Sequence, residues 1–253
     1  MTANITALAC TAGISMVLPL IVFGILWLRN RGERKGMTIL FLSGAAIYAA
    51  TQWGIKEHGL TLLFNHTGLA DFMDAHYIPY LFLVALVGAL LAMFPEYLVI
   101  RFAMKKQITF KEAVTLGLGY GMTEAVLLVG YRSIGTIIEL VREPETDLKV
   151  TTTELFLSGY ERLLIMLIEI ALLMLMIYLI EQNMTVRGCV LEVAGQTMTA
   201  FLPGFFIAFS MKNYFEVYDR SVGLLLVYIM LTVSAVCGII VINSLKYGYN
   251  TRA

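Results

Sequence analysis

Seven long apolar segments dominate this chain, and they restrict its fold more than any other feature of the sequence. A helix that crosses the hydrocarbon core of a bilayer needs about 20 mostly apolar residues. Lipid offers no partner to unpaired backbone groups, so such segments cross a membrane as helices. We therefore expect an all-α, polytopic membrane helix bundle with about seven transmembrane helices. The expected spans are residues 4–28, 37–54, 77–104, 112–131, 156–180, 188–211 and 222–245.

The composition agrees with a chain that is surrounded by membrane lipid. Of the 253 residues, 59% are hydrophobic and 14% are charged, and the mean hydropathy is +0.80, whereas a soluble domain carries roughly 25% charged residues. The 18 basic and 18 acidic residues give no net charge, and a nucleic-acid binder needs a basic excess on one face. We expect no nucleic-acid partner and a single integral membrane domain over residues 1–253.

Basic residues gather in alternate connections between the spans. The connections after the first, third and fifth spans and the C-terminal tail hold Arg29, Arg31, Arg34, Lys35, Arg101, Lys105, Lys106, Lys111, Arg187, Lys246 and Arg252. The opposite connections hold Lys56, Arg142, Lys149, Lys212 and Arg220. Because cytoplasmic loops are enriched in Lys and Arg, we expect a multi-pass protein of the cell membrane, with the N-terminus outside and the C-terminus cytoplasmic. The first span has basic residues after it and none before it, which predicts a retained helix and not a cleaved signal peptide.

Two connections on the expected outer side are long. Residues 55–76 mix apolar and polar side chains, and we expect a short helix in the membrane interface there. Residues 132–155 are acidic and contain Pro144, and we expect a solvated loop.

Ionisable side chains within the spans are the strongest candidates for function. A charge at bilayer depth costs on the order of 3 kcal/mol on insertion scales, and such groups usually face the bundle interior. Glu124 and Glu169 lie near the middle of their spans, so we expect them to face each other or a polar cavity. Glu96 and Glu192 lie nearer the cytoplasmic ends, and Glu192 is close enough to that surface to be hydrated there instead.

Several polar residues are candidate partners of these carboxyl groups. Glu161 can form an ion pair with Arg162 or with Arg132, since all three lie near outer helix ends. Tyr120 lies one turn before Glu124 and can hydrogen-bond it. The candidate catalytic residues are Glu124, Glu169, Glu192 and Glu96, and the candidate binding residues are Tyr120, Glu161, Arg162, Gln196 and Arg132.

Glycine and proline residues lie beside the same carboxyl groups. Gly117, Gly119 and Gly121 precede Glu124, and glycines let a neighbouring helix approach closely or expose a carbonyl group to a ligand; close packing is the commoner role. Pro95 and Pro203 are expected to kink their helices and free a backbone carbonyl group.

The histidine and cysteine residues do not have the sequence spacing that is typical of metal ligands. His58, His66 and His76 all fall in the first outer connection, without the adjacent-turn spacing of a helical metal site. Cys10, Cys189 and Cys237 are isolated from one another. We expect no bound metal and no cofactor.

One stretch carries a family resemblance. Residues 102–128, FAMKKQITFKEAVTLGLGYGMTEAVLL, resemble the YhfC-type intramembrane proteases, which are related to the prenyl-protein (CAAX) proteases and PrsW. In that family a Lys-Lys turn precedes a glycine-rich helix that ends in Glu-Ala, and a later Glu-Arg pair precedes a helix with an inward His. Glu124-Ala125 and Glu161-Arg162 match these two pairs. The resemblance covers residues 77–205 and implies a protease-like core over residues 77–211.

The resemblance also implies motif residues that this sequence replaces. A Glu-Glu…Arg motif aligns with Ala92, Met93 and Glu96, and Glu169 stands where a His is expected. Glu192-x-x-x-Gln196 occupies the place of His-x-x-x-Asp. The chemistry needs a carboxylate to activate water and further groups to bind a metal or an oxyanion. We therefore expect a catalytically degenerate protease fold.

Three functions remain open at this point. The first is a binding or scaffold partner of another membrane protein or peptide, which fits a retained frame with replaced motifs. The second is an active glutamate-type intramembrane peptidase that uses Glu124. The third is a small proton- or cation-coupled transporter whose buried glutamates carry the ion; against it, the sequence shows no inverted repeat. The sequence leaves the oligomeric state and the retention of catalysis open.

Overall fold

The computed structural model describes residues 2–103, 108–143, 150–210 and 220–250, and these ranges contain helices and no strand. The α-helices are α1 (Thr2–Ala12), α2 (Leu18–Arg29), α3 (Arg34–Tyr48), α4 (His58–His66), α5 (Leu69–Ala75), α6 (Tyr77–Leu98), α7 (Phe110–Ala125), α8 (Tyr131–Arg142), α9 (Thr152–Glu181), α10 (Thr185–Ser210) and α11 (Arg220–Asn250). Four π-helical segments join some of them: η1 (Gly13–Val17), η2 (Ala49–Glu57), η3 (Val99–Ala103) and η4 (Val126–Gly130). The all-α prediction is confirmed.

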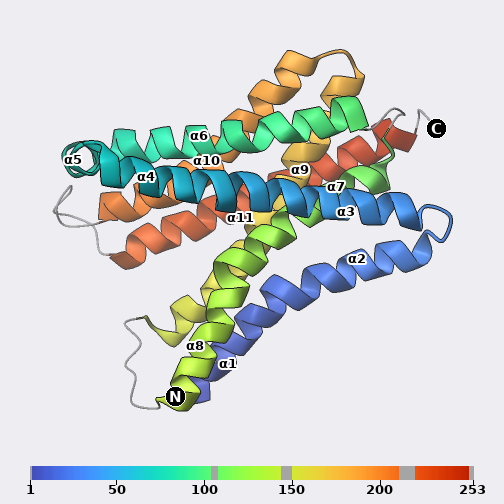
Figure 1. Cartoon of the computed structure of the whole chain (residues 1–253). Helices are drawn as coiled ribbons and strands as arrows, with labels where there is room; N and C mark the ends of the chain where they lie inside the picture. The colour runs from blue at the N-terminus through green and yellow to red at the C-terminus, as the bar shows by residue number, and fades with distance from the viewer. Residues whose placement is uncertain (1, 104–107, 144–149, 211–219, 251–253) are drawn as a thin grey trace.

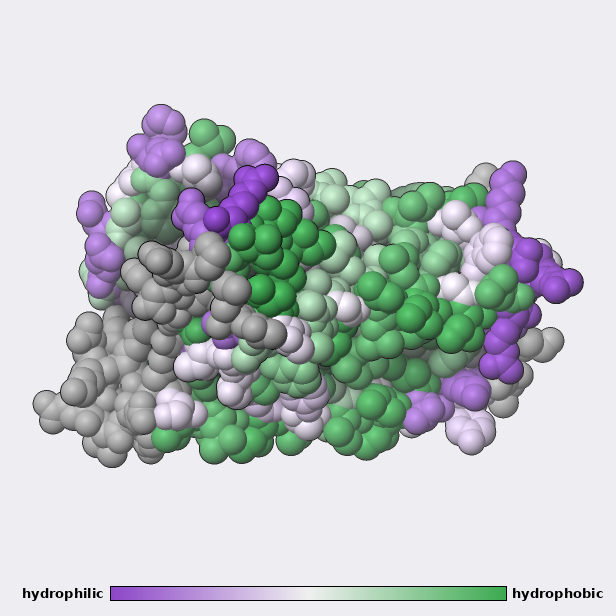
Figure 2. All heavy atoms as spheres, turned by 90° about the horizontal axis from the view of Figure 1, so that it is seen from below, coloured by the Kyte–Doolittle hydropathy of each residue, from purple (hydrophilic) through white to green (hydrophobic). Residues whose placement is uncertain are grey.

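Seven helices of the described chain are long and apolar enough to cross a membrane. They are Ala3–Arg29, Arg34–His66, Tyr77–Phe102, Phe110–Arg142, Thr152–Glu181, Thr185–Ala208 and Ser221–Tyr249. Apolar side chains form a broad band across the middle of the face in Figure 2, and hydrophilic residues gather toward its ends. The protein is therefore a polytopic membrane helix bundle, as the seven apolar segments predict.

Two of these helices extend well beyond the predicted spans. The second runs without a break from Arg34 through η2 to His66, and α5 follows it. Most of the segment 55–76 is therefore helical. The fourth continues through η4 into α8 and ends at Arg142, so the predicted solvated loop is wrong for residues 132–142. Pro144 lies outside the described residues. Both extensions are amphipathic. A span defined by a continuous run of apolar residues therefore ends before the helix does.

Helices α7 and α9 form the centre of the bundle (Figure 1). Helix α7 packs against α3 and α9, while α9 also contacts α1, α10 and α11. Helix α10 lies against α6, α9 and α11. Capping boxes start both central helices, at Thr109 with Glu112 and at Thr151 with Glu154, and satisfy backbone N–H groups that a helix start leaves unpaired.

Glycine residues bring α7 unusually close to both of its neighbours. A Cβ atom on Gly119 would lie 2.0 Å from the Phe41 carbonyl oxygen, and one on Gly44 would lie 2.2 Å from the Leu116 carbonyl oxygen. A Cβ atom on Gly117 would lie 3.0 Å from the Cα atom of Ile170 in α9. Small residues allow such close approach in membrane helices. The glycine run before Glu124 therefore serves packing, which is the role expected from the sequence.

Helix α6 continues through Pro95 and changes to π-helical bonding at Val99. Proline lacks the backbone N–H group that donates within a helix, and the change in bonding follows it by about one turn. The π-helical segments η2 and η4 flank the region described next, in keeping with the frequent occurrence of π-bulges at functional sites.

Candidate functional site

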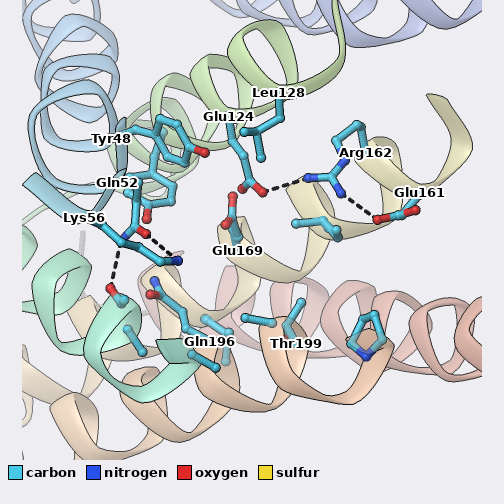
Figure 3. Close-up of a pocket in the computed structure, with 18 of the residues that line it drawn as sticks. Tyr48, Gln52, Lys56, Glu124, Leu128, Glu161, Arg162, Glu169, Gln196 and Thr199 are labelled. Carbon is cyan, nitrogen blue, oxygen red and sulfur yellow. Dashed lines mark hydrogen bonds and ion pairs between the residues drawn. The ribbon is translucent and has the colours of Figure 1, made fainter. Parts of the chain in front are cut away.

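A partly enclosed cavity of about 280 Å³ lies between η2, α6, α7, α9 and α10 (Figure 3). Small residues of α6 (Ala85, Gly88 and Ala89) form one wall and leave room for polar groups from the others. The polar and charged lining residues are Tyr48, Gln52, Lys56, Glu57, Tyr120, Glu124, Glu161, Arg162, Glu169, Gln196 and Thr199. A polar cavity inside a membrane bundle is the setting in which ionisable residues within the spans are expected.

Arg162 links α7 and α9 at this cavity. Its Nη1 atom donates to Glu124 Oε1 at 2.9 Å, and its Nη2 atom donates to Glu161 Oε1 at 2.5 Å. The Arg162 and Glu124 side chains are each 14% exposed, so the pair is largely removed from solvent. The two residue pairs that carry the family resemblance, Glu124-Ala125 and Glu161-Arg162, therefore meet in one ion-pair network.

Glu169 extends from α9 toward Glu124, and their carboxyl groups face each other (Figure 3). The Glu169 Oε2 atom is buried and has no hydrogen-bond partner among the described residues. Gly121 makes room for it, since a Cβ atom there would lie 3.0 Å from Glu169 Oε2. The structure thus places Glu124 and Glu169 together in a polar cavity, as the sequence predicts.

Glu96 and Glu192 lie beyond the cavity lining, buried between α6 and α10. They are 2% and 1% exposed, and the Oε2 atom of each has no hydrogen-bond partner within the described chain. Glu192 is therefore not hydrated at the cytoplasmic surface, so that alternative is wrong. Gln196 lines the cavity and donates from Nε2 to Glu192 Oε1 at 2.7 Å, which connects this inner pair to the cavity.

Two other candidates from the sequence have different surroundings from those expected. Tyr120 is buried and lines the cavity, where its ring packs edge-on against Tyr48 with the ring centroids 5.2 Å apart. Glu124 accepts a hydrogen bond from Arg162, and the bonds of the described residues include none between Tyr120 and Glu124. Arg132 is exposed on α8 and is not among the cavity-lining residues. It has no part in the ion pair with Glu161, because Arg162 takes that place.

The second span contributes four lining residues that are not among the candidates from the sequence, namely Glu57 and a row of three others. Tyr48, Gln52 and Lys56 follow one another at four-residue spacing, and Figure 3 shows them on one side of the cavity. Gln52 Nε2 donates to the Gly88 carbonyl oxygen at 2.7 Å, and Lys56 Nζ donates to Gln52 Oε1 at 3.3 Å. Polar residues at this spacing share a helix face, and this was the signal available in the sequence. Their position near the end of an apolar segment instead suggests exposure to solvent.

The lining residues do not match a zinc centre. Structural and catalytic zinc sites use His or Cys together with carboxylates, but neither His nor Cys lines the cavity. The histidines His58, His66 and His76 are exposed, in the segment 55–76. Within the described ranges, no group of three His, Cys, Asp or Glu residues is placed to hold a metal ion. The cavity instead offers carboxylate, amide, phenol, ammonium and guanidinium groups.

Fold and site together define a polytopic α-helical membrane protein with a carboxylate-rich cavity between its helices. The family model described as YhfC intramembrane metalloprotease matches residues 14–217, well over half of the chain, and the protein belongs to this family. The match begins before residue 77, so it includes the span that contributes Gln52 and Lys56. No curated protein and no solved structure matches the chain.

Proposed function

We propose that this protein is a non-hydrolytic member of its protease family, and that its cavity binds a polar group presented by another molecule of the membrane. The composition of the cavity lining carries this proposal. A metalloprotease needs imidazole, thiolate or clustered carboxylate ligands for its metal. The lining supplies neither imidazole nor thiolate, and the described residues place no three carboxylates around one metal position. Glu124, the residue matched to the family's Glu-Ala pair, is instead engaged by Arg162. Binding and scaffolding need no such ligands.

The size of the cavity favours a single headgroup, side chain or chain end as the bound group. An α-helix with its side chains is roughly 10 Å across, and at 1.5 Å rise per residue about 280 Å³ encloses only about two residues of it. A whole transmembrane helix of a partner is therefore excluded from the cavity. A partner protein or peptide that uses this site inserts one polar group and makes its other contacts on the outside of the bundle.

Hydrolysis by glutamate remains the second candidate because of one specific feature. The Glu169 Oε2 atom is buried, lies beside the Glu124 carboxyl group and has no hydrogen-bond partner among the residues that the structure describes. A carboxylate oxygen of this kind can accept a proton from water and act as a general base.

Profiling of protein N-termini in whole membranes tests the proposal without choosing a substrate in advance. Cells that produce the wild type are compared with cells that produce Glu124→Gln or Glu169→Gln. We expect the same set of N-termini in all three, because the wild type does not cleave. New N-termini that depend on the wild type and disappear in a folded Glu169→Gln variant would establish hydrolysis instead.

We also propose that the protein lies in the cell membrane with its N-terminus outside. The excess of Lys and Arg in the connections after the first, third and fifth spans supports this orientation. The cavity residues Lys56 and Glu161 then lie toward the outer face.

A further inference from the structure

Basic side chains gather at the corner of the bundle where α2 ends and where α3 and α7 begin. They are Arg29, Arg31, Arg34, Lys35 and Lys111. The ion pairs among the described residues include none of these five. Of the two acidic residues beside them in the sequence, Glu33 is exposed, whereas Glu112 is buried and accepts bonds in the capping box of α7. This basic corner therefore carries an excess of positive charge.

Two of the cationic groups are fixed to the end of α2. Lys111 of α7 donates from Nζ to Asn30 Oδ1 at 2.6 Å, and Asn30 Nδ2 donates to the Leu26 carbonyl oxygen at 2.6 Å. Arg34 of α3 donates from Nε to the Trp27 carbonyl oxygen at 3.2 Å. Its guanidinium carbon also lies 4.1 Å from the centroid of the Trp27 ring. The three helices thus hold Arg34 and Lys111 in place at one corner.

These two side chains keep further donors for a ligand. The hydrogen bonds within the described residues use the Nε atom of Arg34 and one of the three N–H groups of Lys111. A guanidinium group can bind phosphate through two parallel hydrogen bonds, and an ammonium group binds it as a point charge. Because both side chains are already ordered, binding costs less conformational entropy than it would with free lysines and arginines. The corner therefore suits a phosphate group.

Exposed apolar side chains lie directly beside the basic corner on both helices of the hairpin. They are Ile25 and Leu28 on α2, and Ile39 and Leu42 on α3. Leu28 immediately precedes Arg29, so the surface of α2 changes there from apolar to basic. Trp27, which donates from its indole nitrogen to Thr38, is of the residue type enriched where a membrane meets water. A phospholipid can place its phosphate on the basic residues and its acyl chains along the apolar ones, whereas a soluble phosphate uses only the first.

We propose that the basic corner between α2, α3 and α7 binds the headgroup of an anionic phospholipid, with Arg34 and Lys111 as the donors to its phosphate. None of the five basic residues lines the cavity, so this site is separate from the cavity and does not rest on the function proposed for it. In the orientation proposed above, the lipid belongs to the cytoplasmic leaflet, where anionic lipids attract basic clusters beside a membrane span.

Quenching of tryptophan fluorescence by brominated lipids tests this proposal. The chain has two tryptophans, and Trp53→Phe leaves Trp27 of the basic corner as the only one. The full-length variant is reconstituted in mixtures of phosphatidylcholine and phosphatidylglycerol in which one lipid carries bromine on its acyl chains. At about 0.1 M salt we expect phosphatidylglycerol to bind beside Trp27 about fivefold tighter than phosphatidylcholine. Quenching that follows the bulk lipid composition overturns the proposal.

The second tryptophan supplies the matched control. Trp53 is exposed on η2 and lies roughly 20 Å along the second span from Thr38, the partner of Trp27. In Trp27→Phe, which leaves Trp53 alone, we expect quenching to follow the bulk lipid composition. An equal preference for phosphatidylglycerol at both tryptophans would show a general attraction of the protein for anionic lipid and would refute a site at the corner.

Two substitutions in the Trp53→Phe background assign the contacts. Arg34→Gln and Lys111→Gln are each expected to lower the preference for phosphatidylglycerol several-fold. Quenching is referred to the fluorescence of the same variant in lipid without bromine, because Arg34 lies on the Trp27 ring. The control Lys246→Gln changes an exposed lysine near the end of α11 and leaves the preference unchanged. An equal loss in Lys111→Gln and Lys246→Gln contradicts a specific phosphate contact.

Native mass spectrometry of the unmodified protein makes the comparison without any substitution. We expect the protein released from detergent to retain phosphatidylglycerol in preference to phosphatidylcholine with the same acyl chains, and equal retention overturns the proposal. Glycerol 3-phosphate, which carries a phosphate without acyl chains, is expected to leave the bound lipid in place. Displacement of the lipid at equal concentrations would establish a site for soluble phosphates instead.

Discussion

Arg162 holds the cavity together at the scale of single residues. It is the one cationic side chain among the described residues that bonds both Glu124 and Glu161. Two charged groups removed from water stabilise a fold only while their partners are present, and loss of one partner leaves a buried charge uncompensated. The Arg162 guanidinium group therefore offsets the cost of placing these two carboxylates within the spans.

We predict that Arg162→Met destabilises the protein by about 3 kcal/mol, since it leaves Glu124 and Glu161 without their cation. The free energy of unfolding is measured by titration of the purified protein with a denaturing detergent. Arg132→Met is the matched control, because Arg132 is exposed on α8, and exposed substitutions change stability by about 0.5 kcal/mol or less. Equal effects of the two substitutions would show that the ion pairs contribute nothing.

The sequence predicts that carboxyl groups lie deep within the spans, but it does not predict that Lys56 is their basic neighbour. The cost of exposing Glu124 and Glu169 to lipid forces both inward, so their sequence position alone is informative. Lys56 lies near the end of an apolar segment, where a long side chain can usually reach the membrane surface. Its ammonium group instead lies against Gly88 of another helix, and this contact is not visible in the local sequence.

At the scale of elements, the contact between α3 and α7 positions one wall of the cavity. Gly44 and Gly119 let these helices touch backbone to backbone. Tyr48 lies one turn after Gly44 and Tyr120 directly follows Gly119, and the two rings are in contact. This explains why the glycine run and the cavity are adjacent. The sequence predicts the close packing of the glycines, but it does not identify α3 as the partner helix.

We predict that Gly119→Ala destabilises the protein by at least about 3 kcal/mol, at the upper end of overpacking effects, because its Cβ atom meets the Phe41 carbonyl group rather than a flexible side chain. The same detergent titration measures the change. Gly24→Ala in α2 is the control, since no atom lies within 4 Å of the added Cβ. We expect it to be neutral or to stabilise by up to about 1 kcal/mol through helix propensity. A neutral Gly119→Ala would contradict the backbone contact.

The lengths of the helices follow from the sequence only where they cross lipid. The seven spans are recognisable because hydropathy is a local property. The extensions to His66 and Arg142 are not, since exposed polar residues alternate with apolar ones there. In α8, exposed Tyr131, Ile134, Ile138 and Val141 share one face, a pattern typical of a helix at a membrane interface.

At the scale of the whole molecule, seven spans and an uneven distribution of basic residues predict the orientation. The spans are described by the structure, whereas the orientation stays a prediction. It also decides from which side a ligand reaches the cavity, because the lining residues Lys56 and Glu57 are the last two residues of η2, directly before α4.

We predict that a cysteine at position 67 reacts with a membrane-impermeant maleimide on intact cells, whereas one at position 32 does not. The variants Thr67→Cys and Gly32→Cys are made in a background in which Cys10, Cys189 and Cys237 are replaced by alanine. Both sites are exposed in the structure and lie at opposite ends of the second span. The reverse labelling pattern would place the N-terminus inside.

Measurement of proton flux distinguishes a binding protein from a proton-coupled transporter. Glu96, Glu169 and Glu192 each have a buried oxygen atom without a hydrogen-bond partner in the described chain, and such groups carry protons in many pumps. We predict that proteoliposomes with the protein show no more proton entry than empty liposomes under an imposed pH gradient. Entry that is abolished by Glu169→Gln would favour the transporter hypothesis.

Zinc stoichiometry tests most directly whether this cavity serves binding without metal-dependent hydrolysis. The protein is expressed with zinc in the medium, purified without chelator, and its zinc content is measured by mass spectrometry with inductively coupled plasma. We predict far less than one zinc ion per chain, and the same zinc content in the wild type and in Glu169→Gln. One zinc ion per chain that survives dialysis and is lost in Glu169→Gln would contradict it.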